Sequence, residues 1–300
     1  MKIGVVFPQT EIGAHSGAVG QYTTTVEALG FDYLLAFEHV LGANPDRPGR
    51  SRGAYDYESL FHEPFVLFGY LAALTTRLEF ATGILILPQR QTALVAKQAA
   101  EVDVLSGGRL RLGIGVGWNA VEYEALGQDF HTRGARQAEQ VTLLRALWTQ
   151  RLVEFEGRFD RVPDAGILPL PVQRPIPIWF GGGADATLRR MARLGDGWMP
   201  NYMSLDELAA RLATLRELLA AAGRDPATFG VDVRIDMRRT GEAEWPATLA
   251  RLAELGATHV CLNTMGNGFD LEAHLDAVRR FYDVAKQMTH DGDETDDERD

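Results

Sequence analysis

The chain has 300 residues, 46% of them apolar and 24% charged, a balance typical of a soluble globular protein. No apolar run approaches the roughly 20 residues that span a bilayer, and residues 1–8 are too short for a secretory signal, so we expect a cytoplasmic protein without membrane contacts. Cys261 is the only cysteine, which excludes an intrachain disulfide and a cysteine-based metal cluster.

The net charge of −11 is concentrated at the C-terminus. Residues 289–300 carry seven acids and one arginine, so this segment holds −6 of the total. It has almost no apolar residues and is expected to be a disordered acidic tail behind a single domain over residues 1–288. No basic stripe with interleaved aromatic residues occurs, which argues against a nucleic-acid partner.

Strand-like and helix-like segments alternate along the chain. The expected strands are 3–7, 33–37, 78–82, 109–118, 176–180, 197–200, 229–235 and 258–262, and the expected helices are 18–29, 64–74, 93–105, 134–148, 184–194, 205–222, 245–255 and 271–288. The pattern breaks only at residues 151–175, where a hairpin from 153 to 159 and a proline-rich connector are expected. Eight strand–helix units without a composition break predict an α/β fold, a (β/α)8 barrel with insertions in its βα loops. An open doubly wound sheet is the alternative.

The stretch from Arg109 to Trp118 is the most informative strand. Leu110, Leu112, Ile114 and Val116 alternate with a period of two. The glycines at positions 113, 115 and 117 weaken a strand, so they indicate a close approach by a planar ligand or by another backbone segment. A glycine-rich junction without a ligand remains the alternative, and the spacing differs from the dinucleotide fingerprint.

In a barrel the site lies at the carboxyl ends of the strands. Those ends are Phe7-Pro8-Gln9, Glu38-His39, Thr82-Gly83-Ile84, Gly115-Val116-Gly117-Trp118, Gly181-Gly182-Gly183, Trp198-Met199-Pro200, Asp236 and Asn263-Thr264. A metal site is not expected, because His39 has no partner at ligand spacing. Acyl transfer lacks a nucleophile elbow. A glycosidase would need facing carboxylates such as Glu38 and Glu122, and we disfavour it.

These strand ends would form an apolar, glycine-rich opening of the barrel, here called its mouth, and such a surface suits a flavin-like ring. Gly181-Gly182-Gly183 leads into a helix N-terminus and so resembles a phosphate cradle, although a flexible turn would have the same residues. His39 is placed to exchange a proton with a reacting group, and its alternative is a structural histidine. The loop over residues 42–63 is interpreted equally well as a lid on the substrate side of the site and as a solvated loop without a function. Its notable residues are Arg47, Arg50, Arg52, Tyr55 and Tyr57.

The sequence resembles the bacterial luciferase-like monooxygenase superfamily. The resemblance covers about residues 1–285 and rests on segments 96–109, 112–119, 175–182 and 195–200, together with Glu122, Gly127, Phe130, Arg133-Gly134 and Glu139. It implies a TIM-type barrel that binds FMN or the deazaflavin coenzyme F420, and the overall pattern is closer to the F420-dependent oxidoreductase branch.

The resemblance also implies roles for individual residues. His39 is expected to lie beside the ring and assist hydride transfer, as the catalytic residue. A non-proline cis peptide bond is expected between Gly83 and Ile84, behind the ring. The cofactor-binding residues are expected to be Pro8, Glu38, Thr82, Gly83, Ile84, Gly115, Val116, Gly117, Trp118, Glu122, Gly181, Gly182 and Gly183. Trp118, Trp179 and Trp198 are expected to line the mouth.

One departure from the family concerns the substrate. Sugar-phosphate dehydrogenases of the F420 branch carry a glutamate where this chain has Trp118, so a small, rather apolar organic substrate is expected. Two other functions stay open: an FMN-dependent monooxygenase and a non-catalytic flavin-binding protein. A homodimer is compatible with the sequence, which does not determine the oligomeric state.

Overall fold

Eight parallel strands close into a barrel in the computed structural model, which describes residues 1–47 and 53–294. The strands are β1 (Lys2–Val6), β2 (Tyr33–Ala36), β3 (Glu79–Thr82) with its continuation β4 (Leu85–Ile86), β5 (Leu110–Gly115), β8 (Ile178–Gly181), β9 (Gly197–Met199), β10 (Gly230–Asp236) and β11 (His259–Asn263). Strand β1 pairs with β11 and β3 pairs with β5, so the ring has no open edge. The predicted (β/α)8 barrel is confirmed.

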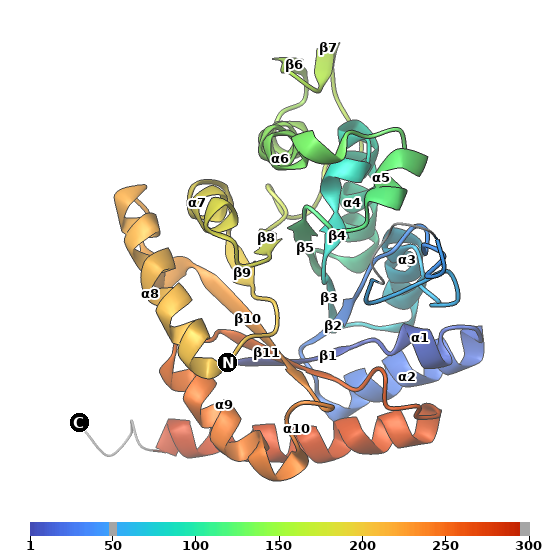
Figure 1. Cartoon of the computed structure of the whole chain (residues 1–300), viewed down its shortest axis with the longest axis vertical. Helices are drawn as coiled ribbons and strands as arrows, with labels where there is room; N and C mark the ends of the chain where they lie inside the picture. Colours follow the sequence, from blue (N-terminus) through green and yellow to red (C-terminus); the bar gives the residue numbers. More distant parts are fainter. Residues whose placement is uncertain (48–52, 295–300) are drawn as a thin grey trace.

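Helices follow the strands and cover the outside of the barrel (Figure 1). The longer ones are α2 (Ser16–Leu29), α3 (Pro64–Leu74), α4 (Thr92–Ser106), α6 (Arg133–Thr149), α7 (Asp185–Leu194), α8 (Leu205–Ala221), α9 (Trp245–Glu254) and α10 (Leu271–Glu294). Their ends follow local chemistry. Helix α3 begins at Pro64, and the Glu63 carboxylate accepts a hydrogen bond from the Val66 N–H. Helix α2 ends at Gly30, which has a φ of 103°.

Two differences from the expected elements stand out. Helix α10 continues to Glu294, six residues beyond the predicted end, because extending an existing helix gains a hydrogen bond for each residue added. The rest of the predicted tail, 295–300, lies outside the described residues. Short helices α1 (Gln9–Ile12) and α5 (Ala120–Ala125) were not predicted.

The insertion between α6 and β8 contains an antiparallel hairpin, β6 (Val153–Glu156) and β7 (Arg161–Ala165), which projects away from the barrel (Figure 1). The predicted hairpin is therefore present and is longer than expected. Its turn is held by Glu139 of α6, whose carboxylate accepts the backbone N–H groups of Arg158, Phe159 and Asp160 at 2.7–2.8 Å.

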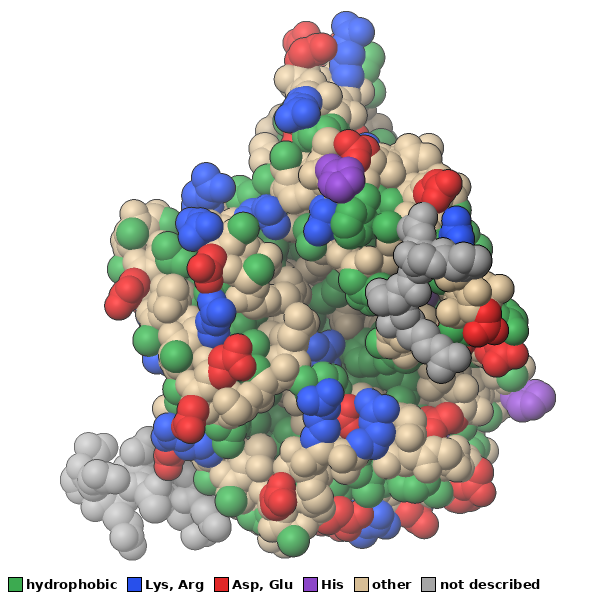
Figure 2. All heavy atoms as spheres, viewed as in Figure 1, with side chains coloured by type: hydrophobic (Ala, Val, Ile, Leu, Met, Phe, Trp, Pro, Cys, Tyr) green, Lys and Arg blue, Asp and Glu red, His purple; other side chains and the backbone are tan. Residues whose placement is uncertain are grey.

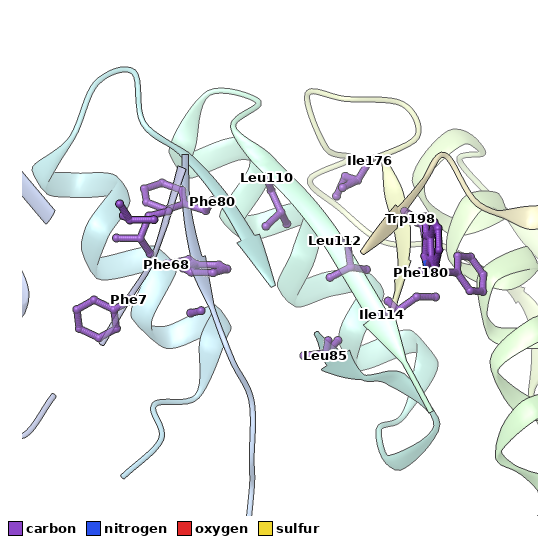
Figure 3. Packing of buried hydrophobic residues seen from close by; sticks show 14 of the residues in the cluster. Phe7, Phe68, Phe80, Leu85, Leu110, Leu112, Ile114, Ile176, Phe180 and Trp198 are labelled. Carbon is purple, nitrogen blue, oxygen red and sulfur yellow. The ribbon is translucent and has the colours of Figure 1, made fainter. Parts of the chain in front are cut away.

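The main hydrophobic core lies between the strands and the surrounding helices. Leu110, Leu112 and Ile114 project from one face of β5 toward aromatic side chains on neighbouring elements (Figure 3). This is the period of two seen in the sequence, with the apolar positions turned outward to the helices. None of the described helices is long and apolar enough to cross a membrane.

A second, smaller cluster fills the barrel interior and includes Tyr33, Trp179 and Met199. A buried ion pair lies in it: the Arg111 guanidinium is 3.0 Å from the Asp232 carboxylate and stacks on the rings of Tyr33 and Trp179. The Tyr33 hydroxyl donates to Asp232 at 2.7 Å. The interior is thus a packed layer beneath the strand ends, and Trp179 belongs to this layer, not to the mouth.

Candidate functional site

A cavity of about 500 Å³ opens at the carboxyl ends of β2, β4, β5, β8, β9 and β10. On the face shown in Figure 2 a hollow lined with hydrophobic side chains has Lys or Arg side chains at its edge. We call this cavity the mouth. It is lined by Phe37, Glu38, His39, Ala54, Tyr55, Gly83, Ile84, Ile86, Gly115, Val116, Gly117, Trp118, Gly181, Gly182, Gly183, Ala184, Thr187, Met199, Asn201, Tyr202 and Arg234.

Most of the predicted site residues line the mouth, but three do not. Pro8 is buried ahead of α1. The Thr82 hydroxyl donates to the Gly113 carbonyl at 2.6 Å, which ties β3 to β5. Glu122 lies behind His39 and reaches the mouth only through it. The Gly83–Ile84 peptide bond is cis, which confirms that prediction.

His39 follows β2 and is held by a buried carboxylate. Its Nδ1 atom lies 3.2 Å from Oε1 of Glu122, and the two side chains are 9% and 0% exposed. Its Nε2 atom has no hydrogen-bond partner among the described residues. The rings of Tyr55, Phe61 and Trp118 surround the imidazole at centroid distances of 5.4, 4.9 and 5.6 Å. The imidazole therefore has one anchored nitrogen and one nitrogen left for a ligand.

Glu122 is the charged member of this pair. Burial alone would raise the pKa of its carboxyl, but hydrogen bonds from His39 and from backbone N–H groups hold that pKa below its ordinary value. The same Oε1 atom accepts the N–H groups of Val40 and Leu41 at 2.8 and 3.2 Å. An ionised carboxylate only accepts hydrogen bonds, so the proton of neutral His39 resides on Nδ1 and Nε2 is an acceptor.

Glu38 precedes His39 in the sequence, but its side chain binds a different set of residues. Its carboxylate accepts the Ile86 N–H at 2.5 Å and the Arg90 Nε–H at 2.7 Å. Arg90 also pairs with Glu63, with 2.9 Å between Nη1 and Oε1. Burial raises the pKa of the Glu38 carboxyl, and Arg90 opposes that rise. Although Glu38 lines the mouth, its carboxylate connects β2 to the segment after β4.

The alternating glycines of β5 make room for the neighbouring strand. A Cβ atom on Gly113 would lie 1.9 Å from the Thr82 carbonyl oxygen, and one on Gly115 would lie 2.3 Å from Ile84 Cδ1. The same holds for Gly181 on β8, where a Cβ atom would approach Ile84 Cγ2 to 2.8 Å. The predicted close approach of another backbone segment is therefore observed at Gly113, whereas Gly115 and Gly181 make room for the Ile84 side chain.

Gly182 and Gly183 are different because they face open space. Gly182 has a φ of 100°, and a Cβ on Gly183 would meet only Met203, at 3.5 Å. Helix α7 begins directly after them without a side-chain cap at Ala184. Its first N–H groups are therefore available to an anion. Asp185 in the first turn opposes such binding, but it pairs with Arg211 at 2.6 Å.

The loop that was predicted as a lid is only partly in the mouth. Tyr55 of this loop lines the mouth, as does Trp118 of the segment after β5. Arg47 lines a separate cavity of about 440 Å³, to which Tyr55 and Trp118 also contribute. Tyr57 is exposed, and Arg50 and Arg52 lie outside the described residues. Trp198 is fully buried and donates a hydrogen bond from Nε1 to the Gly182 carbonyl, so it supports the glycine segment 181–183 from behind.

Sequence reasoning missed Tyr202 and Arg234. Asp232, Arg234 and Asp236 alternate with apolar residues along β10, which places three charged side chains on the inner face of a barrel strand. Charged residues on that face near the carboxyl end of a strand are a site signal in this fold. That alternation was the signal available in the sequence.

Comparison with known proteins supplies a family. A family model described as luciferase-like monooxygenase matches residues 1–298. An uncharacterised protein of Mycobacterium tuberculosis H37Rv is 44% identical over 164 residues, covering 55% of this chain and 56% of that protein. The FMNH2-dependent dimethylsulfone monooxygenase of Pseudomonas fluorescens Pf0-1 is 31% identical over 265 residues, covering 87% of this chain and 64% of that enzyme. Both alignments span less than two thirds of the relative.

A solved structure is similar over nearly its whole length. An F420-dependent secondary alcohol dehydrogenase in complex with an F420-acetone adduct superposes with a TM-score of 0.75 at 18% identity, covering 95% of this chain and 98% of that one. At this identity the likeness bears on the fold alone.

Proposed function

This chain belongs to the luciferase-like monooxygenase family, and from that premise we propose that it is an oxidoreductase that transfers a hydride between coenzyme F420 and a small organic substrate with a largely apolar body. The observation that carries the proposal is the His39–Glu122 pair, which leaves Nε2 of His39 without a hydrogen-bond partner in the described structure, among the aromatic rings at one side of the mouth. When bound, F420 supplies a ring carbon that accepts or donates the hydride.

The proton is the part of the reaction that this chain handles. When an alcohol carbon loses a hydride to become a carbonyl, the hydroxyl proton must leave as well. Nε2 of His39 accepts that proton, and the Glu122 carboxylate stabilises the imidazolium through Nδ1. In the reverse direction the same nitrogen returns the proton to the carbonyl oxygen. Tyr55 and Trp118 reduce the access of water to the imidazole.

The residues fit an anionic, ring-bearing cofactor. Gly182, Gly183 and the uncapped start of α7 offer backbone donors to a phosphate. Ile84, Gly115 and Val116 provide an apolar wall for a flat ring. A phosphate at α7 and a ring above Ile84 would leave the His39 side of the mouth to the substrate.

A second candidate is an FMN-dependent monooxygenase. The observation in its favour is the 31% identity to the FMNH2-dependent dimethylsulfone monooxygenase, which extends over 87% of this chain. The apolar wall at Ile84 and the glycines before α7 suit either cofactor, because both FMN and F420 have a flat ring system and a phosphate. In that case His39 would serve proton exchange with a reduced flavin.

Titration of each cofactor against intrinsic tryptophan fluorescence tests the proposal. Trp118 lines the mouth and is 46% exposed, so bound cofactor should quench it, and Trp118→Phe should lose that part of the signal. We expect F420 to bind more tightly than FMN. Tighter binding of FMN, with oxygen consumption once the flavin is reduced, would favour the monooxygenase. Binding of neither cofactor would reject both functions.

A further inference from the structure

A second cavity, of about 420 Å³, lies next to the mouth between the segments that follow β9 and β10. It shares three lining residues with the mouth, namely Asn201, Tyr202 and Arg234. These three side chains form a wall common to the two cavities. The charges on this shared wall decide which chemical group of a ligand it can bind.

Arg234 is the one Lys or Arg among the described residues that lines the mouth, and its guanidinium is incompletely satisfied. Nη1 donates to the Gly83 carbonyl at 3.3 Å and Nη2 donates to the Pro200 carbonyl at 3.0 Å. The Nε–H group is buried and has no hydrogen-bond partner in the described structure. A buried donor without an acceptor is costly, so this atom is suited to an acceptor supplied by a ligand.

Two more donors lie beside Arg234. Its guanidinium carbon is 5.3 Å from the centroid of the Tyr202 ring, and that of Arg239 is 5.0 Å from the same ring. Arg239 lines the second cavity and makes no ion pair within the part of the chain that is described. The Tyr202 hydroxyl accepts a hydrogen bond from Asn263 at 2.9 Å, which leaves its own proton available. We call Tyr202, Arg234 and Arg239 the arginine–tyrosine stack.

The acidic groups nearby do not neutralise this stack. Asp236 is held by Arg238, whose Nε and Nη2 atoms donate to the two carboxylate oxygens at 3.1 and 2.7 Å. Glu244 also lines the cavity and is exposed to solvent. The described charged residues that line the cavity are Arg234, Arg239, Asp236 and Glu244, which sum to zero; Arg238, which binds Asp236 but does not line the cavity, brings the whole group to one positive charge.

We propose that the arginine–tyrosine stack binds a carboxylate of the substrate, so that the substrate class is an organic acid with an apolar body. This assignment rests on the proposed function, because it places the apolar body and the reacting carbon beside His39 in the mouth. The carboxylate accepts hydrogen bonds from Arg234 Nε, from the Tyr202 hydroxyl and from Arg239. A carboxylate satisfies the buried donor that the fold leaves unpaired, whereas a purely hydrocarbon end would not.

Calorimetric titration with hexanoate and its neutral counterpart hexanamide tests the assignment without requiring turnover. The wild-type protein should bind hexanoate about 10- to 100-fold more tightly than hexanamide, the range for a charge-assisted contact. Arg239→Met should remove most of this preference. Arg234→Met should do so as well, but Arg239→Met is the decisive variant because its guanidinium makes no hydrogen bond to the described chain.

Arg193→Met is the matched control, since Arg193 is exposed on α7 and lines neither cavity. It removes the same charge and should keep the preference for hexanoate. Equal binding of the two probes, absence of binding, or equal losses in Arg239→Met and Arg193→Met would each overturn the assignment. Competition between hexanoate and saturating cofactor would also overturn it, because the stack would then serve the cofactor.

The failure of this inference is distinguishable from failure of the proposed function. Hexanoate selectivity in a protein that binds neither F420 nor FMN would retain the carboxylate site and reject the redox function. Cofactor binding without hexanoate selectivity would retain the function and reject the site.

Discussion

Nδ1 of His39 and Oε1 of Glu122 are 3.2 Å apart, and the same oxygen accepts the backbone N–H groups of Val40 and Leu41. One buried carboxylate therefore fixes the imidazole ring and the chain that follows it. This arrangement joins His39, which follows β2, to Glu122 on α5, and the two residues are separated by 83 positions in the sequence. Its consequences are testable in the following variants.

Glu122→Gln should lower turnover by about 10²- to 10⁴-fold, because an amide at this position can donate to Nδ1 and place the proton on the wrong nitrogen. Cofactor affinity should change less than about tenfold, since Glu122 does not line the mouth. Glu124→Gln, on the exposed side of the same short helix, is the control. Turnover in Glu122→Gln equal to that of the control would reduce Glu122 to a purely structural role.

His39→Ala should keep cofactor binding within about tenfold of the wild type while reducing turnover by about 10²- to 10⁴-fold, the usual effect of losing a positioned proton-transfer group. Single-turnover measurements with saturating cofactor separate the two quantities. His131→Ala, at an exposed position, should behave like the wild type. Turnover that survives the loss of His39 would show that its imidazole is structural.

Glu38→Ala should destabilise the fold by about 3–5 kcal/mol, because it leaves the largely buried Arg90 without its main partner. Glu63→Ala removes the more exposed partner of Arg90 together with the N-cap of α3, and should cost about 1–2 kcal/mol. Urea unfolding of both variants measures the difference. Similar losses in the two variants would contradict the assignment of Glu38 to the fold.

Gly183→Ala should leave the melting temperature unchanged and weaken binding of phosphate-bearing cofactors about tenfold. A Cβ atom at this position meets only Met203, at 3.5 Å, so the protein tolerates it, but the methyl group enters the space above α7. Fluorescence titration reports the affinity and calorimetry the stability. Unchanged affinity for F420 and FMN would place the phosphate elsewhere.

The stability of the protein should fall as the pH decreases from about 6.5. Burial, with a contribution from Arg111, lowers the pKa of His259 from its ordinary 6.5 to about 2. Between these values the unfolded chain binds a proton that the folded chain does not, so this residue reduces the free energy of unfolding by at most about 1.4 kcal/mol per pH unit. Urea unfolding from pH 6 to 4.5 should show a shallower slope for His259→Phe, whereas exposed His15→Phe should match the wild type. Identical slopes in all three proteins would contradict this.

The barrel was predictable because each strand is a short apolar run between turn signals, and each long helix repeats apolar residues over several turns. Helices α1 and α5 were missed because four and six residues are too few to show a helical period. The last helix was ended too early because charge content alone does not stop a helix that is already formed.

The candidate site was predictable where it is made of strand ends, and less so where it depends on contacts between distant residues. The sequence indicates that Glu122 follows β5, but not that its carboxylate reaches behind His39. Trp179 and Trp198 were wrongly placed in the mouth because strand ends alone do not tell which face of the strand a ring occupies. Arg234 was missed although its alternation with Asp232 and Asp236 was visible.

Ile84 gives the mouth an adjustable floor. Its side chain occupies the space that β-carbons on Gly115 and Gly181 would need, so a single residue between two strands determines how deeply a ligand can sit. Neither the His39–Glu122 pair nor the start of α7 depends on that side chain. In the proposed arrangement the cofactor ring lies above Ile84, so shortening or lengthening this side chain would change how deeply the ring sits while leaving the His39–Glu122 pair and the start of α7 in place.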